Sequence, residues 1–82
     1  MRLILIQVEC YAGAKAGEMP CRFVLEERTV EVGEILDRWS EVESQPTWPQ
    51  ADYFKVRGAD LREYLLKHDL ESNEWYWGAR FV

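Results

Sequence analysis

The stretch that decides the fold is residues 52–77, DYFKVRGADLREYLLKHDLESNEWYW. It holds three runs rich in aromatic and aliphatic side chains, at 53–57, 61–68 and 75–77, a composition typical of strands. A glycine-containing turn separates the first two runs, and a six-residue polar segment separates the last two. We therefore expect three successive antiparallel strands that form the core sheet.

The aromatic residues of this stretch divide by the alternation of side chains along a strand. Successive side chains point to opposite faces, so Phe54, Trp75 and Trp77 are expected in the core, and Tyr53 and Tyr76 on the surface. Tyr64 can fall on either side, because its neighbours at 65 and 66 are both leucines that compete for the interior.

Strand patterns also occur earlier in the chain. In residues 2–11, Ile4, Ile6, Val8 and Cys10 share one face and Gln7 and Glu9 lie on the other, while Leu3 and Leu5 make the first half apolar on both faces, which predicts a strand in the interior or at a covered edge. Residues 22–26 and 29–32 form a second hairpin candidate, although its link lacks the Asn-Gly or Asp-Gly of a strong hairpin signal. The segment between these patterns, 12–19, contains small residues and glycines and is expected to be a loop.

Residues 33–43 allow two interpretations. The favoured one is a bent strand with a bulge at Gly33, after which Ile35 and Trp39 share a face. The alternative is one short helix at 33–43, because the apolar residues also fit a helical spacing. The prolines that flank Trp48 then exclude regular structure around it.

These patterns predict the all-β class. We expect a single small domain spanning residues 1–82, built as an antiparallel curled sheet or open barrel of five to six strands.

Charge and composition narrow the function. The net charge of −5 argues against nucleic acid as a partner, because phosphate binding draws its affinity from Lys and Arg. No stretch approaches the roughly 20 apolar residues of a membrane span, and no signal-peptide core is visible. Two cysteines are too few for the disulfide framework of a small secreted domain. We expect a cytoplasmic protein with no membrane association.

Catalytic and metal-binding patterns are weak. His68 is the single histidine, and Cys10 and Cys21 have neither a CxxC partner nor a zinc-type spacing. The paired carboxylates sit in expected turns, where nothing forces one of them to be desolvated. We assign no catalytic, cofactor-binding or metal-binding residue and expect no cofactor; an enzyme is the less favoured reading, and a redox or metal role of the two cysteines stays open.

Aromatic residues next to arginine are typical of protein contact sites, and this chain has more aromatics than a small core needs. We therefore expect a non-enzymatic interaction module that binds a protein or a second copy of itself. The candidate partner-binding residues are Trp48, Tyr53, Arg57, Arg62, Tyr64 and Tyr76. The alternative is a small-ligand-binding or enzymatic barrel with a site near the 12–19 loop and Trp48.

Several short motifs carry a family resemblance that covers most of the chain. They are Cys-Tyr-Ala-Gly at 10–13, Pro-x-Arg-Phe at 20–23, Val-Gly-Glu-Ile-Leu-Asp-Arg-Trp at 32–39, Tyr-Phe-Lys-Val-Arg at 53–57, Tyr-Leu-Leu-Lys-His-Asp at 64–69 and Asn-Glu-Trp at 73–75. In this order they resemble a family of short uncharacterised bacterial proteins. The resemblance implies a compact β domain in a bacterial protein and brings no catalytic residues with it.

Overall fold

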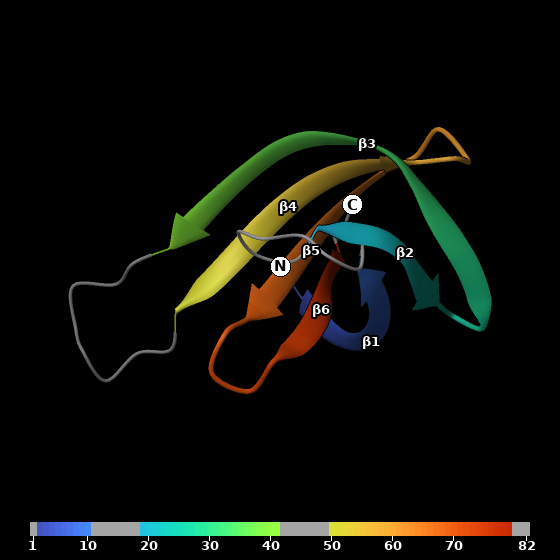
Figure 1. Ribbon diagram of the computed structural model, residues 1–82. Helices are drawn as coiled ribbons and strands as arrows, with labels where there is room; N and C mark the ends of the chain where they lie inside the picture. Colours follow the sequence, from blue (N-terminus) through green and yellow to red (C-terminus); the bar gives the residue numbers. More distant parts are fainter. Residues whose placement is uncertain (1, 11–18, 42–49, 80–82) are drawn as a thin grey trace.

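The computed structural model describes residues 2–10, 19–41 and 50–79, which form six strands (Figure 1). The strands are β1 (Arg2–Cys10), β2 (Pro20–Leu25), β3 (Arg28–Glu41), β4 (Ala51–Gly58), β5 (Glu63–Asp69) and β6 (Glu74–Ala79). Each strand pairs antiparallel with the next, and β6 pairs with β1. The all-β class is confirmed, and the barrel is closed rather than open.

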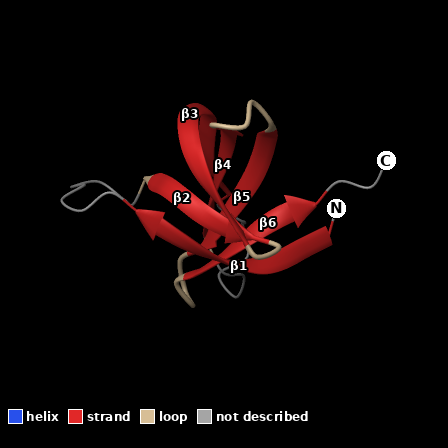
Figure 2. Ribbon diagram, turned by 90° about the vertical axis from the view of Figure 1, so that its right-hand side faces the viewer, coloured by secondary structure: helices blue, strands red, loops and turns tan. Residues whose placement is uncertain are grey.

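The barrel closes because β1 is shared between two neighbours. Its first half, Arg2–Ile6, pairs with β6, and its second half, from Gln7 to Cys10, pairs with β2. Figure 2 shows the curved β1 passing beneath both of these strands. Closure pairs strands that would otherwise lie at the margins of an open sheet, where unpaired backbone groups invite association.

β3 is shared in the same way, and it must bend to reach both neighbours. Its first residues pair with β2, and from Val32 onward it pairs with β4. The register shifts twice, leaving Gly33 and Leu36 as the extra residues of two bulges. The bent strand with a bulge at Gly33 is confirmed, and no helix occurs in the described part of 33–43.

The second bulge corrects one expectation. Ile35 pairs with Val56, whose side chain is fully buried, whereas Trp39 pairs with Tyr53 on the opposite face of β4. Ile35 and Trp39 therefore lie on opposite faces of β3. The extra residue at Leu36 reverses the alternation between them, which a single bulge at Gly33 would have preserved.

The core is a compact cluster inside the barrel. Its members come from all six strands and are Ile6, Phe23, Leu25, Val30, Phe54, Val56, Tyr64, Leu66 and Trp75. Phe23 and Tyr64 meet edge to face with ring centroids 5.1 Å apart, and Phe54 packs against Trp75 at 5.5 Å. The expected burial of Phe54 and Trp75 is confirmed, and Trp77 is partly buried against the same cluster.

Two connections use backbone conformations that their residues disfavour. Glu26 and Glu27, which link β2 to β3, have φ values of 50° and 68°. Two consecutive positive φ values are typical of the type I′ turn that suits a two-residue hairpin, for which Asn-Gly is the common sequence. In the connection from β4 to β5, Leu61 has a φ of 68°, and β5 begins at Glu63 rather than at 61 as expected.

Gly58 is placed where a side chain does not fit. A Cβ there would lie 2.8 Å from Val30 Cγ1 and 2.6 Å from Asp60 Oδ1, whereas a Cβ on Gly33 would have no neighbour closer than 3.4 Å. We predict that Gly58→Ala lowers the free energy of unfolding by about 1–3 kcal/mol through overpacking. Urea denaturation measures the effect, with Gly33→Ala as the matched control. Equal stability of the two variants would contradict the packing of β4 against β3.

Candidate interaction surface

The structure describes five of the six candidate residues, and it separates them. Tyr53, Arg57 and Tyr76 lie on the outer face of the barrel, as their registers with Trp39, Glu34 and Leu5 show. Arg62 lies in the turn before β5, and Trp48 lies outside the described residues. The five described candidates therefore do not form one cluster.

The prediction that Tyr64 belongs to a partner-binding surface is wrong, because Tyr64 lies in the interior. Its side chain is buried and it pairs with the fully buried Val56 on the inner face. Of its two competitors, Leu66 also points inward, and Leu65 points outward beside Lys55. Tyr64 is consequently a core residue and not part of an outer contact surface.

A continuous row of side chains crosses the outer face of five strands. Each member is the direct cross-strand partner of the next, so the side chains are about 5 Å apart. From β3 through β4, β5 and β6 to β1, the members are Trp39, Tyr53, Lys67, Tyr76 and Leu5. We call these five residues the outer row.

One end of the outer row is built from stacked groups. The rings of Trp39 and Tyr53 are almost parallel, with centroids 5.5 Å apart. Lys67 Nζ lies 5.9 Å from the centroid of the Tyr53 ring, within the range of a cation–π contact. Tyr53 is thereby covered on both sides and is only 9% exposed, so the expectation of a surface residue is wrong: Tyr53 lies on the outer face but is buried there, whereas Trp39 remains 39% exposed.

The other end of the outer row is aliphatic. Leu5 is 58% exposed, and Leu3, two residues away on the same face of β1, is 41% exposed. Single exposed leucines are ordinary, but a run of adjacent apolar side chains on an outer surface is not. The outer row therefore has the composition of a contact site along its whole length.

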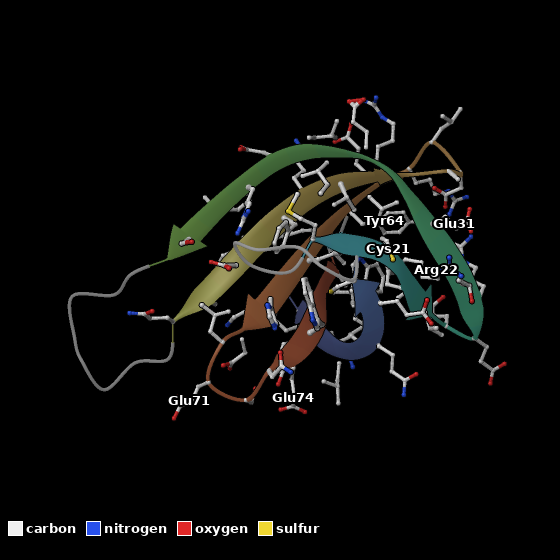
Figure 3. All side chains as sticks on the ribbon, viewed as in Figure 1. Cys21, Arg22, Glu31, Tyr64, Glu71 and Glu74 are labelled. Atoms are coloured by element: carbon white, nitrogen blue, oxygen red, sulfur yellow. The ribbon has the colours of Figure 1, made fainter. Side chains whose placement is uncertain are left out.

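Acidic side chains border the outer row where β5 meets β6. Asp69 and Glu74 are direct cross-strand partners, which places two like charges side by side. Figure 3 shows Glu71 and Glu74 at this turn. Desolvation raises the pKa of Tyr76, and the charges of Glu74 and Asp69 raise it further. We call Asp69, Glu71 and Glu74 the acidic rim.

The arginine next to the outer row is already engaged. Arg57 Nη2 lies 3.7 Å from Glu63 Oε2, and Lys55 Nζ lies 3.5 Å from Glu63 Oε1. All three groups are about half exposed, so these ion pairs add little stability. They hold both cations on this side of the row at one carboxylate, whereas in the acidic rim Asp69 Oδ1 accepts hydrogen bonds from the backbone N–H groups of Glu71 and Ser72.

The inner face carries a polar row at the same end of the barrel as Trp39. Ser40 Oγ donates a hydrogen bond to Asp52 Oδ1 (2.5 Å), and Asp52 pairs across the strands with His68. His68 is buried, stacks on Trp75 at 4.2 Å, and has its Nε2 2.7 Å from Asn73 Oδ1. In a catalytic triad the serine contacts the histidine, and the carboxylate orients the histidine. Here Ser40 contacts the Asp52 carboxylate directly, so the arrangement is not that of a triad.

The ligand-binding alternative places its site near Trp48 and the 12–19 loop. Of these residues, the structure describes only Met19. A hollow lined by described residues lies elsewhere, where β1 changes partner from β6 to β2. It has a volume of about 960 Å³ and is bordered by Ile4, Ile6, Leu25, Glu26 and Trp77, among others.

Within the described ranges no group of three or more potential metal ligands occurs. The same ranges contain no helix that is long and apolar enough to cross a membrane.

Comparisons of this chain with protein-family models, with curated proteins and with solved structures gave no match.

Sequence reasoning found Tyr53 and Tyr76 but missed Trp39, Lys67 and Leu5. Trp39 was expected on the face of Ile35, and only the second bulge moves it outward. Lys67 and Leu5 follow from alternation once the register between strands is known. The register itself has no signal in the sequence of a single strand.

At the far end of the barrel, Tyr64 joins two charged residues. Its hydroxyl donates to Asp60 Oδ2 (2.5 Å) and accepts from Arg28 Nη2 (3.2 Å). The hydrogen bond from Tyr64 is the largest cause of a lowered pKa of Asp60, and desolvation is the largest cause of a raised pKa of Tyr64. A lowered carboxyl pKa stabilises the fold above the ordinary pKa of Asp, and this contribution is lost as the pH falls.

We therefore predict that Tyr64→Phe lowers the free energy of unfolding by about 1 kcal/mol at pH 7, because hydrogen bonds are lost while the ring packing is kept. The difference in the free energy of unfolding between wild type and variant narrows as the pH falls from about 5 to about 2. Thermal denaturation across this range measures it. A gap that stays constant or widens in acid would show that Asp60 does not depend on Tyr64.

Proposed function

We propose that the chain is a protein-interaction module of the bacterial cytoplasm, without catalytic activity, and that it contacts its partner through the outer row. The observation that carries the proposal is the unbroken cross-strand order of Trp39, Tyr53, Lys67, Tyr76 and Leu5 on the outside of a closed barrel. The core lies on the other side of the sheet, so it does not explain the apolar side chains of Trp39 and Leu5, which are 39% and 58% exposed. Aromatic anchors of this kind supply most of the energy in protein interfaces.

The acidic rim indicates the chemistry of the partner. Asp69 and Glu74 repel one another in the free protein, and a basic side chain placed beside them would remove that cost. The partner is accordingly a protein that presents Lys or Arg next to an apolar contact. The same rim and the net charge of −5 disfavour nucleic acid.

Ligand binding is the second candidate, and one observation favours it. The hollow of about 960 Å³ falls within the size range of small-molecule sites, and Trp77 is among its lining residues. Its lining comes from β1, β2 and β6, and it includes inner-face side chains of all three strands, such as Ile6, Phe23 and Trp75. A metabolite screen followed by tryptophan fluorescence tests the candidate, and a saturable change would support it.

The test of the leading proposal is retention of partners from a lysate of the native host by the tagged chain. We expect the double variant Trp39→Ser/Tyr76→Ser to lose the retained protein, with binding at least about tenfold weaker, because truncated aromatic anchors cost more than about 1 kcal/mol each. Quantitative mass spectrometry of the retained proteins measures the loss.

The control is Leu61→Ser. Leu61 is 81% exposed and lies in the turn between β4 and β5, away from both the outer row and the acidic rim. The control should retain the same proteins as the wild type, and both variants should keep their melting temperature within a few degrees. Retention of the same proteins by the outer-row variant would overturn the proposal.

A further inference from the structure

The turn between β5 and β6 keeps two like charges together. Asp69 and Glu74, which end and begin these strands, are direct cross-strand partners, so their side chains lie next to each other on one face. Between them, Asn73 has a φ of 58°, which costs free energy for a residue other than glycine. Such costs persist only where the surrounding contacts hold the residues in place. The contacts of this turn therefore determine how the acidic rim is arranged.

One contact reaches this turn from inside the barrel. His68 Nε2 lies 2.7 Å from Asn73 Oδ1. An amide oxygen only accepts hydrogen bonds, so Nε2 carries the proton and donates it to Asn73. Because His68 is only 5% exposed, water competes little for this donor. The last residue of the turn is thus tied to a residue of the inner face.

The imidazole ring is itself held in place by the core. It stacks on Trp75, its direct cross-strand partner, with ring centroids 4.2 Å apart and planes 4° from parallel. Trp75 packs in turn against Phe54, which is fully buried. The ring of His68 cannot turn away from Asn73 without losing this stacking. The position of Asn73 is therefore set by the packed aromatic residues of the core.

The first part of the turn has contacts of its own. Asp69 Oδ1 accepts hydrogen bonds from the backbone N–H groups of Glu71 and Ser72, at 3.0 and 3.3 Å. These two bonds hold the beginning of the turn, whereas the bond from His68 holds the residue that precedes Glu74. The two halves of the turn are therefore fixed by different side chains, one outside the barrel and one inside it.

We infer that His68 is a positioning residue, which through Asn73 holds Glu74 beside Asp69 and so keeps the acidic rim preformed. The inference rests on the proposed function, in which the rim receives a basic side chain of a protein partner. A preformed pair of carboxylates binds such a group more tightly than a mobile pair, because less conformational freedom is lost on binding. His68 is buried, so it acts through Asn73 and does not touch the partner.

Tyr76, on the outer face two residues after Glu74, reports on the arrangement of the rim. Desolvation raises the pKa of its hydroxyl, and the charges of Glu74 and Asp69 raise this pKa further. The contribution of the charges depends on how near the two carboxylates lie to the hydroxyl. Release of the turn lets the carboxylates move away, and the pKa of Tyr76 then falls toward its ordinary value. A loss of stability elsewhere in the barrel leaves this pKa unchanged.

Two substitutions in the full chain break the hydrogen bond from opposite ends. Asn73→Gly removes the acceptor and keeps the backbone, because glycine adopts a φ of 58° without strain. His68→Phe removes the donor and keeps an aromatic ring for stacking on Trp75. Titration of ¹³C-labelled tyrosine by NMR measures the pKa of Tyr76. We expect each variant to lower this pKa, and the double variant to lower it no further, because both act through one hydrogen bond.

The control is Tyr64→Phe, which loses hydrogen bonds at the far end of the barrel and should leave the pKa of Tyr76 unchanged. A Tyr76 pKa unaltered by both single variants would overturn the inference, as would shifts that add in the double variant.

A host protein retained by the wild type should bind about threefold more weakly, or worse, to Asn73→Gly. Full binding by this variant would also overturn the inference. A wild type that retains no protein contradicts the proposed function alone, because the titration of Tyr76 needs no partner.

Discussion

The barrel depends on the bending of β3. This strand has 14 residues and must pair first with β2 and then with β4, which no straight strand could do. Two bulges, at Gly33 and Leu36, supply the bend by inserting residues that have no partner on β4. Because β3 reaches both neighbours, the sheet closes, and the core aromatics are enclosed on all sides by six short strands.

The same bend decides which residues face outward. After Leu36 the alternation reverses, so Arg38 lies over the ring of Phe54 inside while Trp39 stacks on Tyr53 outside. The cation of Arg38 is held near Asp52, which keeps a charge at the mouth of the barrel paired. Outside, the row combines aromatic, lysine and leucine side chains, whereas inside this end of the barrel Ser40, Asp52 and Arg38 are hydrogen-bonded or ion-paired.

The sequence predicts the fold class well and the surface only in part. Alternation in 52–77 identifies three strands and the burial of Phe54 and Trp75, because each strand has one clearly apolar face. It fails at Tyr64, whose neighbours are equally apolar, and only the pairing with Val56 decides its side. Gly33 marks the first bulge, but no residue type marks the second at Leu36, so the outward position of Trp39 follows from tertiary pairing alone.

The outer row as a contact surface is tested most directly by site-specific photocrosslinking in living host cells. A photoreactive phenylalanine analogue at Tyr76, illuminated in the cell, should form a covalent adduct with another protein. The same analogue at Leu61, which is more exposed but lies away from the row, should form none. Absence of an adduct from Tyr76, or the same adduct from both positions, would contradict the assignment of the outer row as the site of contact.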